Sequence, residues 1–242
     1  MNLTRAVSIL LCVPFTIVTL LHAGEKDKSP APVAVAPGAD PGKAPADAIV
    51  LFDGRDFSHW VHPDGSPVKW DLADGAMIVK PKTNSIMTKD NFGDAQLHVE
   101  FATPSMPDKQ GQDRGNSGVY MQGRYEVQVL DSYQSETYHD GQCGAIYSEH
   151  PPLVNACRPP EQWQTYDIIF RAPKFSAEGV KTEPGNLTVL HNGVLIQDHA
   201  PVGGSTTASL YKEQPADGPL VLQDHWCPVK YRNIWIRPLG KK

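Results

Sequence analysis

The sequence predicts an all-β protein built as a sandwich of two antiparallel sheets. Gly and Pro are abundant, with 20 and 22 copies among 242 residues, against a combined ~12% in average proteins. Between these turn residues lie short runs of apolar and β-branched residues, which are typical of strands. No window longer than about ten residues carries a 3.6-residue period with helix caps. Many short strands with frequent turns favour a sandwich over a helical bundle.

The expected strands follow one another between residues 49 and 236. The first, Ile49-Val50-Leu51-Phe52, opens the folded region, and the last ends before Pro238. Asn192-Gly193 separates two strand-like runs, and this dipeptide is the strongest short signal for a hairpin. We expect the first and last strands to pair. The runs cover residues 49–52, 76–79, 96–101, 117–121, 125–130, 166–170, 187–190, 194–197, 220–222 and 231–236.

The N-terminal sequence predicts export. Arg5 precedes an uncharged apolar run over residues 6–21, and small residues follow, in the order of a cleavable signal peptide. We therefore expect a signal peptide (1–23), a disordered Pro/Ala-rich linker (24–47) and a folded domain (48–239). A protein with this signal is expected to be secreted or to reside in the periplasm or cell envelope. A retained membrane anchor is the alternative, although the run is shorter than the ~20 residues that span a bilayer.

Composition limits the classes of partner. The formal net charge is −5, and no run of basic residues exceeds the terminal Lys241-Lys242. Nothing in this pattern predicts a phosphate-binding face, so we expect no nucleic-acid partner. Once the signal is removed, we expect no stable membrane span. With 40% hydrophobic residues, the chain can form a sizeable core.

Three cysteines remain after the signal peptide. In an oxidising compartment we expect one disulfide, and Cys143 with Cys157 is the favoured pair because the two close a short loop. The chain-entropy gain for such a loop is about 3 kcal/mol. Cys227 is then expected to be a free, buried thiol.

Two polar runs stand out among the strands. Because side chains alternate with period two, Glu126 and Gln128 share one face of their strand, and Asp131 follows at its end. Gln223 and His225 share the face of Val221 in the second run. If the two strands are neighbours, their side chains supply the acid and base of a proton-transfer site. The alternative is an ordinary solvated strand face.

Several other chemistries lack their motifs. The zinc signatures H-E-x-x-H and C-x-x-C and the phosphate-binding loop G-x-x-x-x-G-K-[ST] are absent. Gly115-Asn116-Ser117-Gly118 does not continue as a nucleophile elbow, because the next residue is Val119. No cofactor is certain. A divalent metal such as calcium remains possible because its sites need no fixed spacing. Trp226, beside His225, is the tryptophan favoured for stacking on a sugar, and core packing is the alternative.

An ordered series of motifs resembles a known family of secreted bacterial proteins, the 3-keto-disaccharide hydrolase domain. The resemblance spans residues 48–239 and implies a concanavalin A-like, laminarinase-like jelly roll. Cys227 departs from the small polar residue usual in the family. The motifs, in order, are Leu51-Phe52-Asp53-Gly54 with Trp60, 115–120, 125–131, 143–147, 163–166, Asn192-Gly193, 222–225 and 232–235.

The resemblance implies cleavage of 3-keto-disaccharides or other 3-keto-glycosides, by hydrolysis or by removal of the C2 proton followed by elimination and hydration. Either route needs a base, an acid for the leaving group and groups that stabilise an enolate. We expect Glu126 or His225 to be the base. A non-catalytic, lectin-like carbohydrate-binding module is the alternative on the same fold. The candidate substrate-binding residues are Asn116, Tyr120, Gln128, Asp131, Gln223, Arg232 and Trp226.

Overall fold

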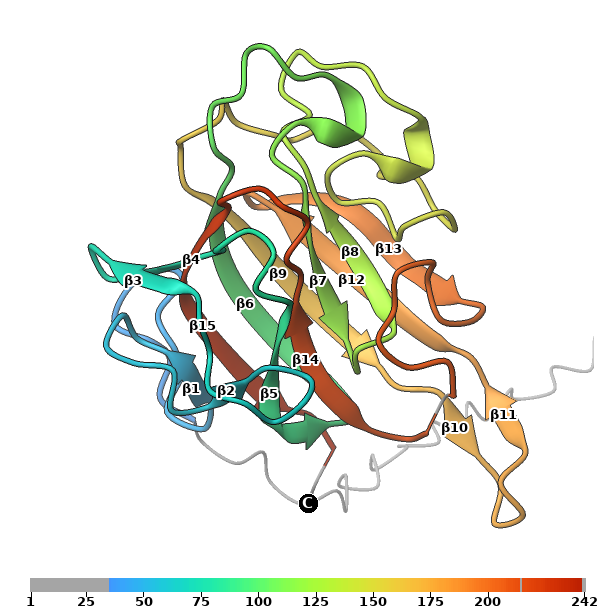
Figure 1. The fold of residues 1–242 in the computed structure, drawn as a ribbon. Helices are drawn as coiled ribbons and strands as arrows, with labels where there is room; N and C mark the ends of the chain where they lie inside the picture. Colours follow the sequence, from blue (N-terminus) through green and yellow to red (C-terminus); the bar gives the residue numbers. More distant parts are fainter. Residues whose placement is uncertain (1–34, 214, 241–242) are drawn as a thin grey trace, which may run out of the picture. The chain divides into compact units, whose positions relative to one another are not determined.

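Two antiparallel β-sheets lie face to face in this protein, as predicted (Figure 1). The structure, a computed structural model, describes residues 35–213 and 215–240. The expected signal peptide lies outside the described residues. Within them, helical structure is confined to two short 3-10 turns, η1 (Gly111–Asp113) and η2 (His139–Gly141). No helix in these ranges is long and apolar enough to cross a bilayer.

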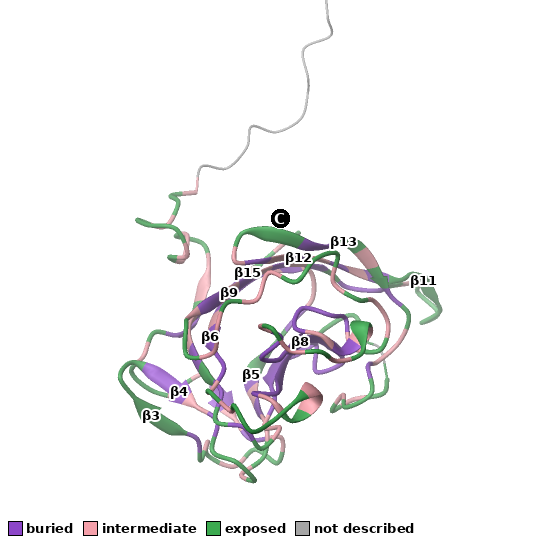
Figure 2. Ribbon diagram, turned by 90° about the horizontal axis from the view of Figure 1, so that it is seen from above, coloured by how far each residue is buried: buried purple, intermediate pink, exposed green. Residues whose placement is uncertain are grey.

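The larger sheet has eight strands and contains both ends of the domain. The first strand pairs with the last, Ile49 facing Ile236, as the sequence predicts. In Figure 2 this sheet forms an arc, and β5 and β8 of the smaller sheet lie inside it. Its order is β13 (Val194–Val202), β12 (Gly185–His191), β9 (Gln164–Arg171), β6 (Ala95–Ala102), β15 (Lys230–Pro238), β4 (Ala76–Ile78) and β3 (Asp71–Ala73), with β1 (Ile49–Phe52) also on β15.

The smaller sheet has five strands and carries both polar runs that stand out in the sequence. β14 pairs with β7, and β7 pairs with β8, so the two runs are separated by one strand. A separate hairpin joins β10 (Lys174–Phe175) to β11 (Lys181–Glu183). The order of the smaller sheet is β2 (Trp60–Val61), β5 (Ile86–Phe92), β14 (Gly218–Leu222), β7 (Ser117–Met121) and β8 (Tyr125–Val129).

The expected Asn-Gly hairpin joins β12 to β13. His191 faces Val194 across the turn, and both turn residues have positive φ, +53° at Asn192 and +80° at Gly193. Asn and Gly tolerate this left-handed conformation, and its twist matches that of the flanking strands. The local sequence therefore sets the register of this edge of the larger sheet.

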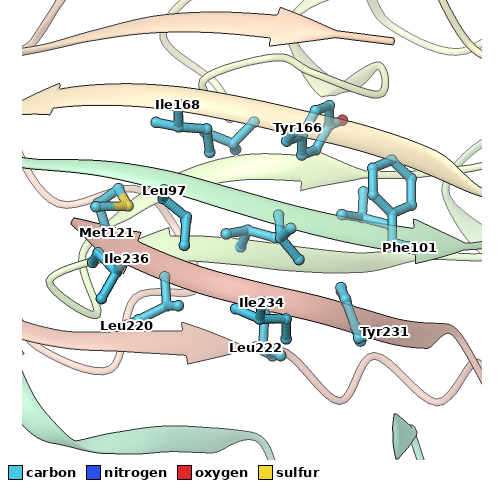
Figure 3. Close-up of a cluster of buried hydrophobic side chains, with 14 of the residues drawn as sticks. Leu97, Phe101, Met121, Tyr166, Ile168, Leu220, Leu222, Tyr231, Ile234 and Ile236 are labelled. Atoms are coloured by element: carbon cyan, nitrogen blue, oxygen red, sulfur yellow. The ribbon is translucent and has the colours of Figure 1, made fainter. Parts of the chain in front are cut away.

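The hydrophobic core fills the space between the two sheets (Figure 3). Leu97 and Ile234 of the larger sheet lie opposite Leu222 of the smaller one, and all three are fully buried. On β8, Tyr125, Val127 and Val129 belong to this core. Period-two alternation then directs the intervening side chains to the outer face of the smaller sheet.

The segment before β1 is ordered over its described part, residues 35–47, and differs from the free linker expected there. The Gly42 carbonyl accepts hydrogen bonds from Asn233 Nδ2 at 2.9 Å and Trp235 Nε1 at 2.8 Å. Arg237 also pairs with Asp47 at 2.7 Å. These contacts attach the segment to the outer face of β15. Pro/Ala-rich composition predicts an extended chain, but it does not reveal buried donors elsewhere that need an acceptor.

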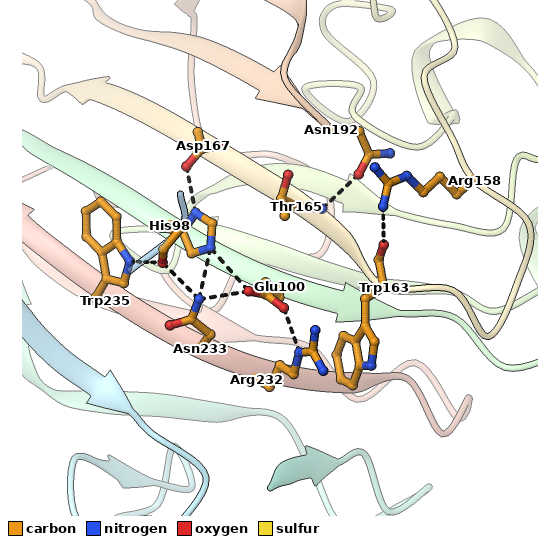
Figure 4. Close-up of polar contacts among 11 residues, drawn as sticks. His98, Glu100, Arg158, Trp163, Thr165, Asp167, Asn192, Arg232, Asn233 and Trp235 are labelled. Carbon is orange, nitrogen blue, oxygen red and sulfur yellow. Dashed lines mark hydrogen bonds and ion pairs between the residues drawn. The ribbon is translucent and has the colours of Figure 1, made fainter. Parts of the chain in front are cut away.

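Beneath that segment, a cluster of charged and aromatic side chains covers the outer face of the larger sheet (Figure 4). His98 is 2% exposed, and its Nδ1 lies 2.7 Å from Asp167. Burial lowers the pKa of His98, but contacts with Asp167 and Glu100 outweigh it and raise the pKa to about 9. Arg232 Nε lies 2.6 Å from Glu100, and its guanidinium lies 4.0 Å from the Trp163 ring centroid.

The expected disulfide is not formed, which corrects that prediction. Cys143, Cys157 and Cys227 are all free thiols. Cys143 Sγ instead lies 3.0 Å from Tyr166 Oη, and the Cys157 thiol donates to the Leu130 carbonyl at 3.7 Å. The Cys143 and Cys157 thiols also interact with each other as hydrogen-bond partners. Loop length alone predicted the pairing, whereas the surrounding hydrogen bonds accommodate two separate thiols.

Candidate active site

A pocket of about 220 Å³ lies on the outer face of the smaller sheet. Its strand residues come from β8 and from the chain directly after β14. These two strands are near each other because β7 lies between them and pairs with both. Loops complete the wall, from η1, from the segment after η2 and from the β13–β14 connection. The lining residues are Gln112, Asn116, Glu126, Gln128, Tyr147, Thr207, Ala208, Gln223 and His225.

Glu126 is the buried acid of this pocket. The residue is 2% exposed, although it lines the cavity. Burial raises the pKa of its carboxyl to about 8, and a hydrogen bond with Tyr120 offsets only part of that shift. The carboxyl is therefore mostly protonated at neutral pH, which suits a group that donates a proton.

Gly118 and Tyr120 of β7 hold the Glu126 side chain. The hypothetical Cβ of an alanine at position 118 would overlap Glu126 Oε1 and lie 2.7 Å from the Tyr120 ring. Gln223 Nε2 donates to Tyr120 Oη at 2.8 Å, so the Tyr120 hydroxyl proton is free to point to Glu126. Gly118 therefore leaves the space that the carboxyl occupies. A glycine in a strand interior is a recognised sign of such a close approach.

A network of amides forms another side of the pocket. Gln112 Oε1 accepts from Gln128 Nε2 at 2.9 Å and from Asn116 Nδ2 at 3.2 Å. Gln112 Nε2 in turn donates to the Gly141 carbonyl at 2.9 Å. These bonds orient the Gln128 amide, because its nitrogen faces acceptors only. They also connect η1 to the η2 loop.

Two glutamines that line the pocket each carry a buried amide oxygen without a protein partner. Oε1 of Gln128 and Oε1 of Gln223 accept no hydrogen bond from the described residues. The two side chains are 1% and 9% exposed. An unsatisfied buried acceptor costs about 1–3 kcal/mol, so each favours a ligand that brings a hydroxyl donor.

His225 and Tyr147 complete the polar surface. His225 is half-buried, and its ring makes no hydrogen bond with the described residues. The segment bearing Tyr147 runs along β8, with the Tyr147 N–H donating to the Glu126 carbonyl at 3.2 Å. The Tyr147 hydroxyl bonds to that of Tyr138. An imidazole available for proton transfer therefore lines the same pocket as the buried acid.

Five of the nine candidate site residues line this pocket, and the other four lie elsewhere. Tyr120 lies behind Glu126, and Trp226 is exposed beside His225. Asp131 is fully buried, and its Oδ2 accepts from Arg114 Nε at 2.6 Å. Arg232 belongs to β15 in the other sheet. The five that line the pocket are Asn116, Glu126, Gln128, Gln223 and His225.

Some pocket residues were not expected from the sequence. Tyr147, Thr207 and Ala208 sit in loops, where no local periodicity points to a function. Gln112 lies in the η1 turn and likewise had no signal. Gly118 did have one, because it interrupts an otherwise apolar and β-branched strand.

No cluster suited to a metal ion occurs in the described ranges, where no three His, Cys, Asp or Glu side chains come together. Asp131, the carboxylate that follows β8, is engaged by Arg114 and by the backbone N–H of Tyr133. The expectation of a possible calcium site therefore has no supporting donor set here.

The fold is a two-sheet antiparallel sandwich, and its pocket combines one buried carboxyl with amide and imidazole side chains. Residues 47–237 match the family described as the 3-keto-alpha-glucoside-1,2-lyase-like domain. The chain belongs to that family, as its motifs indicated.

Solved structures from Parabacteroides distasonis are similar to this chain. One, described as a candidate glycosyl hydrolase, is 42% identical over 94% of this chain and 100% of that one, with a TM-score of 0.84. A second with the same description is 20% identical over 80% and 94% of the two chains, with a TM-score of 0.61, and shows the fold alone. No curated protein matches the sequence.

Proposed function

We propose that this protein cleaves 3-keto-glycosides, with 3-keto-disaccharides as the substrate class. The observation that carries the proposal is the buried, protonated carboxyl of Glu126 in a pocket that is also lined by two glutamines, each with an unpartnered amide oxygen. A polyhydroxylated ring offers the hydroxyl donors that these oxygens lack. The family and the 42% identical relative support carbohydrate chemistry.

A ketone at C3 changes which catalytic groups are needed. Ordinary glycosidases use two carboxylates about 5–9.5 Å apart, whereas Glu126 is the only carboxylate among the described residues that line this pocket. The C3 ketone acidifies the C2 proton, so one base can remove it. The glycosidic oxygen at C1 then leaves by elimination. A single acid with a separate base fits this chemistry.

We assign the acid role to Glu126 and the base role to His225. The imidazole of His225 takes the C2 proton, and the electron pair of that C–H bond forms the enolate at C2, C3 and the C3 oxygen. When the enolate collapses, the C1–O bond breaks, and Glu126 gives its proton to the leaving oxygen. Water added across the resulting double bond yields the free 3-keto sugar. Proton exchange with solvent restores both groups.

Hydrolysis by direct attack of water at C1 is the competing route. The two routes differ at C2, because elimination breaks the C2–H bond in every turnover, whereas direct attack of water leaves it intact; the free 3-keto sugar kept in D₂O without enzyme controls for exchange by simple enolisation. A reaction in D₂O should therefore place deuterium at C2 of the released 3-keto sugar. Product without deuterium at C2 would contradict elimination and leave hydrolysis.

The decisive assay compares a 3-keto-disaccharide with its unoxidised parent. We expect release of the monosaccharide from the keto substrate only. Glu126→Gln and His225→Ala should each lower kcat by about 10²-fold or more, the lower end of general acid–base contributions. Val180→Ala is the matched control, because Val180 is exposed and lies in the β10–β11 turn, which contributes no residue to the pocket. Normal rates in both site variants would refute the assignment, and binding without turnover would favour a lectin-like module.

We also propose that the protein is exported. Support comes from Arg5, the apolar run at 6–21 and the small residues after it. Cell fractionation and N-terminal sequencing of the mature protein test this directly. An intact N-terminus in the cytoplasmic fraction would overturn it.

A further inference from the structure

Trp226 is the most exposed large hydrophobic side chain among the described residues, at 69%. Single exposed apolar side chains are normal at protein surfaces, so exposure alone identifies no site. Two further observations indicate a functional role for this tryptophan: its backbone conformation and its place beside the pocket.

The backbone holds Trp226 in a conformation that bulky residues avoid. Its φ is +62°, in the left-handed region. Asp224 stabilises the turn, because its Oδ1 accepts from the Trp226 N–H at 2.9 Å and its Oδ2 accepts from the N–H groups of Thr83 at 2.9 Å and Asn84 at 3.1 Å. The Asp224 N–H also donates to Ser85 Oγ at 3.1 Å. Such over-determined strain is concentrated at functional sites.

Trp226 does not line the pocket, but its ring contacts that of a residue that does. Its ring centroid lies 5.6 Å from that of His225, which lines the cavity. No contact with the core accounts for the indole, since Trp226 is absent from the buried cluster of the described residues. The indole is therefore a solvent-exposed aromatic surface next to a pocket residue.

The pocket itself is small. Its volume of about 220 Å³ falls below the ~300–1,000 Å³ of clefts that hold drug-sized ligands. One sugar ring fits this volume better than two. The second ring of a disaccharide then has to lie outside the pocket, beside its rim.

We infer that the exposed indole of Trp226 is a stacking platform for the second sugar ring, the leaving group of the substrate. The inference rests on the proposed function, because it places the 3-keto ring in the pocket. The apolar C–H face of a pyranose covers an aromatic ring well, and tryptophan offers the largest such surface. Trp226 is thus a specificity-determining residue that selects disaccharides over glycosides with a small leaving group.

The test uses the full chain and two substrates, a 3-keto-α-glucosyl-glucose disaccharide and methyl 3-keto-α-glucoside. Trp226→Ala should lower kcat/KM for the disaccharide by about 3- to 10-fold, as expected for loss of one aromatic stacking contact. The loss for the methyl glycoside should be much smaller. Trp226→Phe keeps an aromatic face and should recover most of the difference, while Val180→Ala controls for removal of an exposed apolar side chain elsewhere.

Binding measurements separate this inference from the proposed function. Calorimetry with Glu126→Gln and with Glu126→Gln/Trp226→Ala compares affinities without turnover. A selective loss of disaccharide affinity supports the platform even if the wild type cleaves neither substrate, and then only the proposed function fails. Equal losses for both ligands, or none, with an active wild type overturn the platform and leave the function. If the wild type neither binds nor cleaves either ligand, both proposals fall.

Discussion

At Gly118, the missing side chain is what lets the Glu126 carboxyl lie against the floor of the pocket. The hypothetical Cβ of an alanine there would overlap Glu126 Oε1 and approach the Tyr120 ring to 2.7 Å. Both side chains are at most 2% exposed, so an added methyl group has to displace buried atoms. Residue 118 therefore controls the position of the acid without touching the substrate.

We expect Gly118→Ala to damage both stability and activity. Overpacking of this kind costs about 1–3 kcal/mol, and displacement of Glu126 should lower kcat by 10-fold or more, since misplacement by about 1 Å can cost ~10²-fold. Urea unfolding and steady-state kinetics on the 3-keto-disaccharide measure the two effects. Gly203→Ala is the control, because a Cβ there meets only Glu149 Oε1 at 4.0 Å. Wild-type stability and kcat in Gly118→Ala would contradict this prediction, because they would show that the side chains around residue 118 move aside at little cost.

At the scale of elements, two irregular segments cover surfaces that the sheets leave exposed, one a strand edge and the other a sheet face. The chain at Gly144–Tyr147 hydrogen-bonds along β8 and so covers its free edge. The segment before β1 covers the outer face of the larger sheet, where the Gly42 carbonyl satisfies Asn233 and Trp235. Gly42 has φ +83°, and its hypothetical Cβ would lie 3.2 Å from His98 Nε2.

The attachment of the N-terminal segment can be tested at Gly42. Gly42→Ala adds both the strain of a positive φ and a tight contact with His98, whereas Gly65→Ala has a similar φ of +79° with nothing within 4 Å of its Cβ. We expect both to lose about 1 kcal/mol from backbone strain. Gly42→Ala should lose more, and only it should shift the His98 titration followed by NMR. Identical behaviour of the two variants would mean that the segment is not attached at this point.

At the scale of the whole molecule, four groups with shifted pKa values shape the pH dependence of stability: the buried His98, Glu126 and His191, and the part-buried Glu100. Burial raises the pKa of Glu126 to about 8, and the carboxylate contacts of His98 outweigh its burial and raise its pKa to about 9. Burial and nearby Arg158 lower the pKa of His191 to about 4. Burial would raise the pKa of Glu100, but bonds from His98, Asn233 and Arg232 lower it to about 2.

The direction in which each group changes the stability of the protein with pH follows from how many protons the folded and unfolded states bind. A raised folded pKa favours folding below the unfolded value, and this stability is lost as pH rises through the folded value. The protein therefore loses the stability that Glu126 contributes as pH rises from about 4.5 to 8, and the contribution of His98 as pH rises from about 6.5 to 9. A group whose pKa is lowered on folding contributes stability at higher pH, and this contribution is lost as pH falls. The protein therefore loses the contribution of His191 as pH falls from about 6.5 to 4, and that of Glu100 as pH falls from about 4.5 to 2.

We therefore expect a stability plateau between about pH 4.5 and 6.5, where the Glu126 and His191 effects oppose each other. Stability should fall most steeply between about pH 6.5 and 8, where Glu126 and His98 add, each with roughly 1.4 kcal/mol per pH unit. Glu126→Gln should halve that slope and make the protein more stable than wild type at pH 8. Urea unfolding from pH 4 to 9 measures this, with His98→Gln as the companion variant. An unchanged slope in Glu126→Gln would show that this carboxyl ionises normally.

The strand sequences alone determined the sandwich, the Asn-Gly hairpin and the faces of the polar residues. These features are local, because turn residues set φ and period-two alternation assigns each side chain to a face. Glu126 and Gln128 share an outer face for that reason, and Gln223 and His225, directly after β14, line the same pocket. The motifs also indicate the family, and the match over residues 47–237 confirms it.

Only the tertiary structure decided which of these faces meet. Strand order places β7 between the two polar runs, and it sends Arg232 to the other sheet, where Glu100 engages it. The loop residues Gln112 and Tyr147 reach the pocket through long-range contacts that leave no local pattern in the sequence. The raised pKa of Glu126 likewise depends on burial, which arises only when separate parts of the chain enclose the group.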